Sequence, residues 1–329
     1  MNGQSKATKI LNIKYPIIQG PMSWITNADF VSRVSNAGGL GVLGANAGQN
    51  QKASDPIDAA NKMRIEIEKV KQMTKHSFAI NIVMHDNTDE ISDYIERMLS
   101  VAFDEGVHYF VTVGAPNQNV FQRIKDHGGV IIHRPLTPTV DNMVEAERNG
   151  ADILVATGSE AGGVFPEHRL TTADVVAKII EQVHVPLFAA GGINTVEDIR
   201  ALESYHVAGL FVGTMFIVTK ESPLASSAKQ LIIRSKAGDM VNVSAKIRSI
   251  NTAKAIALHE IYADVNSPID VNAEIKKING MKTGMLDGDI DGGIVSVNTH
   301  IDSIDHEMTI SEVVETFGEY CNMVMLANA

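Results

Sequence analysis

One short stretch of the sequence combines adjacent glycines with a titratable side chain. The stretch TGSEAGGVFPEHRL, Thr157 to Leu170, contains Gly162 and Gly163 and then Val164. Glycines without a Cβ atom let a backbone approach a bound group closely. Valine cannot transfer a proton, whereas an imidazole such as that of His168 can take part in acid–base chemistry. The stretch therefore predicts a binding loop with His168 as a candidate catalytic residue, although His168 could equally be a solvent-facing loop histidine.

Two further glycine motifs follow apolar runs. They are AAGGI, Ala189 to Ile193, with Gly191 and Gly192, and FVGTMF, Phe211 to Phe216. Backbone N–H groups of such loops commonly bind phosphate, and the hydroxyl of Thr214 could add a donor. A glycine pair after a strand also occurs in simple tight turns, but two motifs in consecutive units favour a phosphate site. We therefore expect a phosphorylated cofactor or substrate.

Side chains near two other apolar runs could contact a flat ring. The stretch QGPMSWITN, Gln19 to Asn27, contains Met22 and Trp24, which could also be ordinary core residues. Asn81 lies among apolar residues in AINIVM, where a buried amide requires a hydrogen-bond partner. A ring system with polar edges would supply that partner.

Short apolar runs alternate with amphipathic segments along most of the chain. Alternation of buried strands and helices is typical of a parallel sheet covered by helices. About eight such units favour a closed (β/α)8 TIM barrel, with an open sheet carrying an insertion as the alternative. The strand candidates are YPIIQG, GLGVLGA, SFAINIVM, HYFVTVG, GVIIHR, ADILVATG, VPLFAAGG and VAGLFVGT.

The pattern changes after Glu221 to helical segments, a glycine-rich stretch and a final helix near TISEVVETFGEY. We interpret residues 1–222 as the barrel core and residues 223–329 as a C-terminal helical cap or lid packed against the barrel mouth. The carboxyl ends of the strands meet at that mouth, where active sites of such barrels lie. His133, in IIHRPLTP at the end of the fifth predicted strand, is expected to point towards it and is a second catalytic candidate.

Composition limits the partners and the compartment. The net charge of −11 disfavours nonspecific binding to nucleic acid or to an anionic membrane surface. The single cysteine, Cys321, permits no intrachain disulfide, and no run of about 18 apolar residues suggests a membrane span. The histidines show no metal-ligand spacing, so no metal is expected. These features favour a cytoplasmic protein, with a homodimer left open.

The quoted motifs also resemble a known family. Five stretches, in order from Tyr15 to Ser222, are similar to the nitronate monooxygenase family, formerly called 2-nitropropane dioxygenases. They are YPIIQGPMSWITNADFVSRVSNAGGLGVLGA, FAINIVM, VATGSEAGG, PLFAAGGINTVEDIRAL and LFVGTMFIVTKES. That family includes FMN-dependent enoyl-acyl-carrier-protein reductases and related quinone reductases. The GDIDGG stretch, Gly288 to Gly293, resembles the reductase branch.

The resemblance implies a TIM barrel that holds FMN noncovalently. Against the isoalloxazine ring it puts Gly20, Pro21 and Met22. Asn81 is expected to contact the flavin or its phosphoribityl chain, and Thr157 stands where the family often has a flavin-contacting glutamine. On the phosphate side it puts Gly162 or Gly163, Gly191, Gly192, Phe211, Val212, Gly213 and Thr214. This phosphate side coincides with the site predicted from the glycine motifs.

The sequence departs from the family at the position of its usual base. Many members read GGH where this chain reads Gly162, Gly163 and Val164, and about two extra residues precede LTT. A base therefore cannot be assigned to Val164, and His168 becomes the first substitute because the longer loop could bring its imidazole over the flavin. Glu160 is expected to anchor the loop instead.

Three functions follow from these observations, and the sequence favours the first because a reductase tolerates the loss of the base better than a nitronate oxidase does. The first is an NAD(P)H-dependent reductase of the enoyl type, since hydride transfer from NADH or NADPH to FMN needs positioning rather than a protein base. The second is a nitronate monooxygenase, which needs no deprotonation when its substrate is already an anion. The third is a noncatalytic FMN-binding protein. A small-molecule or acyl-thioester substrate suits the two enzymes.

Overall fold

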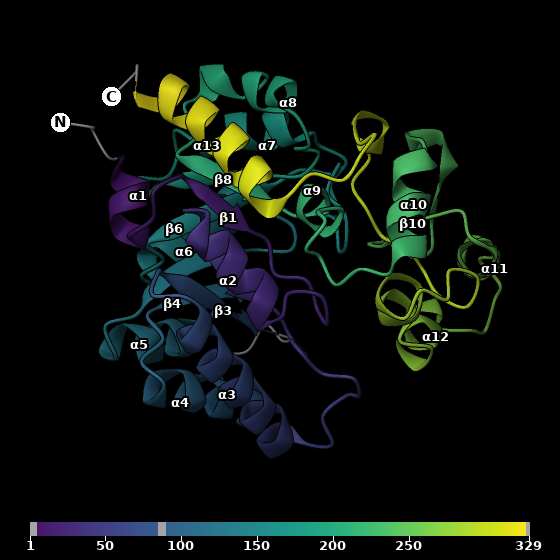
Figure 1. Cartoon of the computed structure of the whole chain (residues 1–329), viewed down its shortest axis with the longest axis horizontal. Helices are drawn as coiled ribbons and strands as arrows, with labels where there is room; N and C mark the ends of the chain where they lie inside the picture. Colours follow the sequence, from purple (N-terminus) through teal and green to yellow (C-terminus); the bar gives the residue numbers. More distant parts are fainter. Residues whose placement is uncertain (1–4, 85–89, 327–329) are drawn as a thin grey trace.

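Eight parallel strands form a barrel in the computed structural model, which describes residues 5–84 and 90–326 (Figure 1). The strands pair in the order β1-β8-β7-β6-β5-β4-β3-β2, and a parallel bridge between Ile18 and Leu40 joins β1 to β2. The predicted TIM barrel is confirmed, and the open-sheet alternative is wrong. The barrel strands are β1 (Ile17–Gln19), β2 (Gly41–Leu43), β3 (Phe78–Val83), β4 (Tyr109–Val113), β5 (Val130–Arg134), β6 (Ile153–Thr157), β7 (Leu187–Ala190) and β8 (Gly209–Val212).

Helices connect the strands and begin at residues that can cap them. The side chains of Asn27, Asp55 and Ser92 each accept a hydrogen bond from an N–H in the first helical turn. Thr171 and Asp174 form a reciprocal capping box at the start of α7, the helix that follows β6. The helices up to β8 are α1 (Lys6–Leu11), α2 (Ala28–Asn36), α3 (Pro56–Met73), α4 (Asp93–Asp104), α5 (Gln118–Asp126), α6 (Val140–Arg148), α7 (Thr172–Ile179), α8 (Val196–Arg200) and the short η1 (Glu203–Tyr205).

Alternate strand residues fill the barrel interior. Ile132, Val155 and Phe188 belong to one buried cluster that also contains Leu11 of α1. Helix α1 therefore closes the amino-terminal end of the barrel, because its apolar face packs with the inward-facing residues. Residues one position away, such as Ile131, belong to the larger cluster between the strands and the helices. The parity of a residue along its strand thus decides which side of the barrel wall it faces.

The chain after β8 forms a second, smaller group of elements and then returns to the barrel. Its apolar residues, Val243, Leu258 and Ile275 among them, make a separate buried cluster. In Figure 1, α11 and α12 lie away from the barrel, whereas α13 runs beside α2 and α8. The boundary at residue 222 stays a prediction. These elements are α9 (Thr214–Ile217), α10 (Ser226–Arg234), η2 (Ala237–Asp239), β9 (Met240–Asn242), β10 (Arg248–Ile250), α11 (Ala253–Ala263), α12 (Val271–Lys277), η3 (Lys282–Leu286), η4 (Ile301–Ser303) and α13 (Ile310–Leu326).

Candidate active site

The glycine loop, residues 158–165, follows β6 at the carboxyl end of the barrel. The carboxylate of Glu160 accepts hydrogen bonds from the backbone N–H of Thr172 at 2.9 Å and from its hydroxyl at 3.2 Å. Thr172 is the first residue of α7, so the carboxylate also lies at the positive end of that helix. Glu160 therefore anchors the loop, as the sequence suggested.

The C-terminal segment binds the outer side of the glycine loop. The N–H of Gly163 donates to the hydroxyl of Ser296 at 3.1 Å. Val164 forms an isolated antiparallel bridge with Ile247, and the N–H of Phe165 donates to the carbonyl of Lys246 at 3.0 Å. The backbone at Val164 is thus part of the contact with the segment that precedes β10.

The two adjacent glycines of the loop have different surroundings. A Cβ atom at Gly162 would lie 2.7 Å from the carbonyl carbon of Val297, so glycine is required there by the C-terminal segment. Gly163 has a φ of +68°, and its Cβ position faces open space. We predicted that either glycine allows close approach of FMN. The open space favours Gly163 for that contact, and Gly162 has a structural reason of its own.

Arg134 reaches the glycine loop from inside the barrel. It is the last residue of β5 and has the same parity as Ile132, which faces the interior. Its Nε donates to Thr157 Oγ1 at 3.1 Å, and its Nη2 donates to the carbonyl of Val164 at 3.2 Å. Burial lowers the pKa of the guanidinium to about 10, so the group stays charged at neutral pH. No carboxylate in the described part of the chain forms an ion pair with it.

Arg248 reaches the same loop from the C-terminal segment. Its Nη2 donates to the carbonyl of Ser159 at 2.5 Å, and its guanidinium lies 4.1 Å from the centre of the Phe165 ring. Its Nε is enclosed without a partner among the described residues. Burial lowers the pKa of Arg248, and the nearby charge of Arg169 adds to that effect. Two guanidinium groups, the buried one of Arg248 and the partly buried one of Arg134, therefore hold the two ends of one loop.

His133 does not point towards the barrel mouth, and this expectation was wrong. Its ring is fully buried, lies 5.2 Å from the ring of Phe121 on α5, and shares a 3.0 Å hydrogen bond with Thr112. Because Ile132 faces inward, the next residue must face the helices outside the barrel. Burial lowers the pKa of His133 to about 3, so its imidazole is neutral. His133 therefore lies between the barrel wall and α5, away from the side chains at the barrel mouth.

His168 is turned towards the loop after β5. Its Nε2 donates to the carbonyl of Pro138 at 3.1 Å, and its Nδ1 is enclosed without a partner among the described residues. The neighbouring N–H of Glu167 donates to the hydroxyl of Thr137. The longer loop is therefore attached to residues 137–138, and a catalytic role for His168 stays a prediction.

Asn81 and Thr157 lie at inward positions of their strands. Asn81 is 8% exposed, and its Nδ2 donates to the carbonyl of Val111 at 2.9 Å. The neighbouring strand thus satisfies the amide N–H₂, and no described residue donates to the amide oxygen of Asn81. Thr157 is fully buried and accepts the hydrogen bond from Arg134. Their contacts with a flavin stay predictions.

The loop after β1 begins with Gly20, Pro21 and Met22, as the motif suggested. The N–H of Gly20 donates to the carbonyl of Val212 at 2.8 Å, which ties the ends of β1 and β8 together. Trp24 has a φ of +71°, a conformation that non-glycine residues rarely adopt. Such a conformation persists only where surrounding contacts fix it, and it marks this loop as a candidate part of the site.

The loops after β7 and β8 are joined by the C-terminal segment. Asn298 and Asn194 exchange two side-chain hydrogen bonds, and the N–H of Asn298 donates to Thr214 Oγ1 at 2.9 Å. The hydroxyl proton of Thr214 is left to donate elsewhere. His300 Nδ1 contacts the carbonyl of Gly192 at 2.6 Å and the carboxylate of Asp198 at 3.1 Å. The hydrogen bond to Asp198 raises the pKa of His300 above its ordinary value.

The remaining predicted residues occupy the same two loops. Gly191 directly follows β7, and Phe211 is an inward residue of β8 at 7% exposure. Gly213 precedes α9, and open space lies at its Cβ position. Val212 faces outward in the larger apolar cluster, so only its backbone is available at the mouth.

The family model described as nitronate monooxygenase matches residues 4–319. The chain belongs to the nitronate monooxygenase family. It is 29% identical over 279 residues to a probable nitronate monooxygenase of Staphylococcus aureus (strain JH9), covering 73% of this chain and 75% of that protein. A probable nitronate monooxygenase of Staphylococcus haemolyticus (strain JCSC1435) is also 29% identical, over 276 residues, covering 72% of this chain and 74% of that protein.

Solved structures with the same fold extend across nearly the whole chain. FabK from Thermotoga maritima superposes with a TM-score of 0.85 at 22% identity, covering 99% of this chain and 98% of that one. Nitroalkane oxidase from Streptomyces ansochromogenes superposes with a TM-score of 0.78 at 22% identity, covering 98% and 99%. Membership of the nitronate monooxygenase family identifies the chain as an oxidoreductase, as predicted.

Sequence reasoning missed the two arginines and His300. The sequence contained one usable signal, because Arg134 follows His133 directly and the two must face opposite sides of the strand. Assigning the inward side to Ile132 would have selected Arg134. The sequence gave no comparable signal for Arg248 or His300, which reach the nitronate monooxygenase family's glycine motifs from more than 80 residues away.

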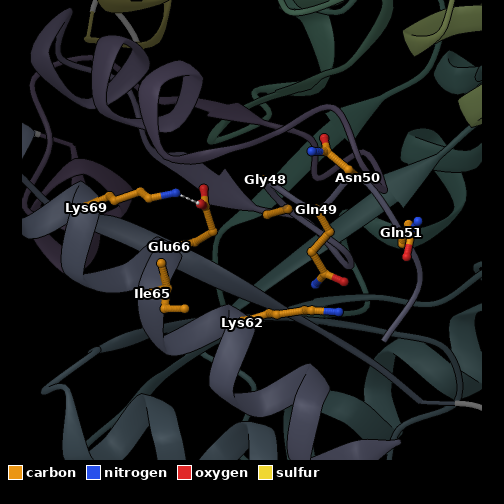
Figure 2. Close-up of a pocket in the computed structure, with 9 residues that line it drawn as sticks. Gly48, Gln49, Asn50, Gln51, Lys62, Ile65, Glu66 and Lys69 are labelled. Atoms are coloured by element: carbon orange, nitrogen blue, oxygen red, sulfur yellow. Dashed lines mark hydrogen bonds and ion pairs between the residues drawn. The ribbon is translucent and has the colours of Figure 1, made fainter. Parts of the chain in front are cut away.

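A separate pocket of about 440 Å³ lies between the loop after β2 and α3 (Figure 2). Glu66 is 3% exposed there, accepts from the N–H of Ala28 at 2.9 Å and pairs with Lys69 at 2.6 Å. It therefore stabilises the start of α2. None of the predicted site residues lines this pocket, whose lining residues are Ala47, Gly48, Gln49, Asn50, Gln51, Lys62, Ile65, Glu66 and Lys69.

Two negative findings apply to residues 5–84 and 90–326. No group of three or more histidine, cysteine, aspartate or glutamate side chains there is arranged to hold a metal ion. No helix in the same ranges is long and apolar enough to cross a membrane.

Proposed function

We propose that this oxidoreductase binds FMN at the barrel mouth and oxidises alkyl nitronates. The observation that carries the proposal is the glycine loop at Val164. A side chain without a proton-transfer group stands at the family's histidine position, and the Val164 carbonyl accepts from the partly buried cation of Arg134. A nitronate is the already ionised form of a nitroalkane, so its oxidation needs no base. The names of the curated relatives support the same activity.

The strand ends are suited to an anionic, ring-containing cofactor. Open space lies at the Cβ positions of Gly163 and Gly213. Asn81 of β3 and Thr157 of β6 face the inside of the barrel. When bound, FMN would accept electrons from the substrate and pass them to O₂. The chain's own contribution is to bind and orient the substrate and to supply a fixed positive charge near it.

A reductase is the second candidate. The fold is shared with FabK, and the stretch from Gly288 to Gly293 resembles the reductase branch. The sequence alone favoured this activity, because a reductase tolerates loss of the base at Val164. We place it second because the names of the relatives favour nitronate oxidation. The noncatalytic alternative predicts bound FMN that no donor reduces.

Anaerobic mixing separates these functions. The FMN-loaded protein is mixed in separate experiments with propyl-1-nitronate, NADH and NADPH, and the loss of oxidised flavin absorbance is followed. We expect loss with the nitronate and not with either nicotinamide. Loss with a nicotinamide alone would establish the reductase instead, and absorbance unchanged by all three donors would support the noncatalytic protein.

A further inference from the structure

Arg134 has hydrogen-bonding capacity that the described protein does not use. An arginine side chain carries five N–H donors in a planar arrangement. One donor of Arg134 binds Thr157 and one binds the carbonyl of Val164. Nη1 has no hydrogen-bond partner among the described residues and is not one of the enclosed unpartnered atoms, so its two donors face accessible space. That space lies on the inward side of β5, at the strand ends.

The charge of Arg134 is also uncompensated within the described residues. Arg64 and Arg123, for comparison, each form an ion pair with a carboxylate. Placing a charge in a poorly solvated site is costly unless an opposite charge accompanies it. The chain has 39 acidic residues, so the absence of a partner here is not due to a shortage of carboxylates. A partly buried cation with unused planar donors is suited to an oxyanion.

We propose that Arg134 is the residue that binds the oxygens of an anionic substrate and favours it over its neutral form. The proposal rests on the proposed function, in which the substrate is a nitronate. Two parallel donors of a guanidinium match the two oxygens of a nitronate group as they match those of a carboxylate. The fixed cation binds a substrate that is already deprotonated. The site therefore needs no protein base to produce the anion.

Arg248 offers a matched control on the same loop. Both arginines donate to a carbonyl of the glycine loop, at Val164 and at Ser159 respectively. Arg248 lies against Phe165 and comes from the C-terminal segment, whereas Arg134 ends a barrel strand. If the arginines act only by holding the loop, replacing either should have the same consequence.

The test uses nitrate, a planar oxyanion that cannot reduce the flavin. FMN-loaded wild type, Arg134→Met, Arg134→Lys and Arg248→Met proteins are titrated with sodium nitrate at constant ionic strength, and the visible flavin spectrum gives the Kd. FMN affinity is measured for each variant by flavin fluorescence. We expect Arg134→Met to weaken nitrate binding by about 10- to 100-fold, the loss typical of a charged hydrogen-bond partner. Arg134→Lys should retain part of that affinity, and Arg248→Met should retain nearly all.

Three results would overturn the proposal. The first is no nitrate binding by the wild type. The second is equal weakening by Arg134→Met and Arg248→Met, which would leave both arginines with a structural role only. The third is loss of FMN from Arg134→Met with unchanged nitrate affinity in the fraction that keeps it. Nitrate binding that depends on Arg134, in a protein that does not oxidise nitronates, would instead remove the proposed function and keep the anion site.

Discussion

On each side of the glycine loop an arginine donates a hydrogen bond to a loop carbonyl, but the two arginines have different surroundings. On the outer side, Arg248 stacks on Phe165, and Ser296 accepts the N–H of Gly163. On the inner side, Arg134 also donates to a loop carbonyl but keeps donors that face the strand ends. A guanidinium at the end of a barrel strand can therefore reach a ligand, whereas one from the C-terminal segment secures the loop. Position in the fold, and not residue type, separates the two roles.

The largest effect on the outer side should come from Gly162. In Gly162→Ala the new Cβ would lie 2.7 Å from the carbonyl carbon of Val297, so backbone must move. We expect a loss of about 3 kcal/mol in the free energy of unfolding, measured by urea denaturation. The control is Gly163→Ala, which faces open space and should cost only the left-handed conformation, about 1 kcal/mol. Equal losses in the two variants would contradict the close approach of the C-terminal segment.

On the inner side, anion binding should depend on pH in a way set by residue 134. Burial lowers the pKa of Arg134 to about 10, so the cation is present below that value and is lost above it. Nitrate affinity should be constant from neutral pH up to the pKa of Arg134, about 10, and should fall by about tenfold per pH unit above that pKa. In Arg134→Lys the fall should begin at lower pH, because lysine has a lower ordinary pKa than arginine and burial lowers it further. Superimposable profiles for the two proteins would refute this assignment.

A smaller effect on FMN affinity is expected at His300, which contacts Gly192 in the loop after β7. The hydrogen bond to Asp198 raises the pKa of His300 above 6.5, so the imidazolium persists at higher pH than usual and is lost as pH rises further. If the phosphate of FMN lies at Gly192, FMN affinity should fall by about two- to fivefold through that range. His300→Gln should bind FMN without this pH dependence. Asp198→Asn, which removes the raising contact, should move the change to lower pH; an unmoved change would assign it to another group.

The smallest effect should come from Val164→His. A histidine at this position supplies the base that the family commonly has, and activity on neutral 1-nitropropane should rise. The rise should be slight, because the backbone of Val164 is bound to Ile247 on the outer side and to Arg134 on the inner side. Oxygen consumption with neutral 1-nitropropane measures it. A rate equal to that with the nitronate would show that the missing base alone limited the wild type.

The barrel was predictable because its signals are local. Apolar runs such as ADILVATG alternate with segments that begin at capping residues such as Thr171 and Thr195, and the structure places strands and helices there. The glycine motifs after β6, β7 and β8 were likewise visible in short windows. Each depends on backbone preferences within a few residues.

The side-chain partners were less predictable because they come from distant parts of the chain. His133 was assigned to the mouth although its parity with Ile132 places it outside, an error that strand alternation could have prevented. Gly162 contacts Val297, and Asn194 pairs with Asn298, only because the C-terminal segment returns to the barrel. No pattern within the barrel sequence indicates that return.

The central claim is that the site selects an anion through Arg134, and one anaerobic comparison tests it most directly. FMN-loaded wild type and Arg134→Met are each mixed with propyl-1-nitronate or with neutral 1-nitropropane, and the initial rate of flavin reduction is recorded. We predict rapid reduction of the wild type by the nitronate alone, and a slower reduction of Arg134→Met that no longer saturates at the same concentrations. Equal rates with the neutral and anionic forms, or a nitronate rate that Arg134→Met leaves unchanged, would contradict the account.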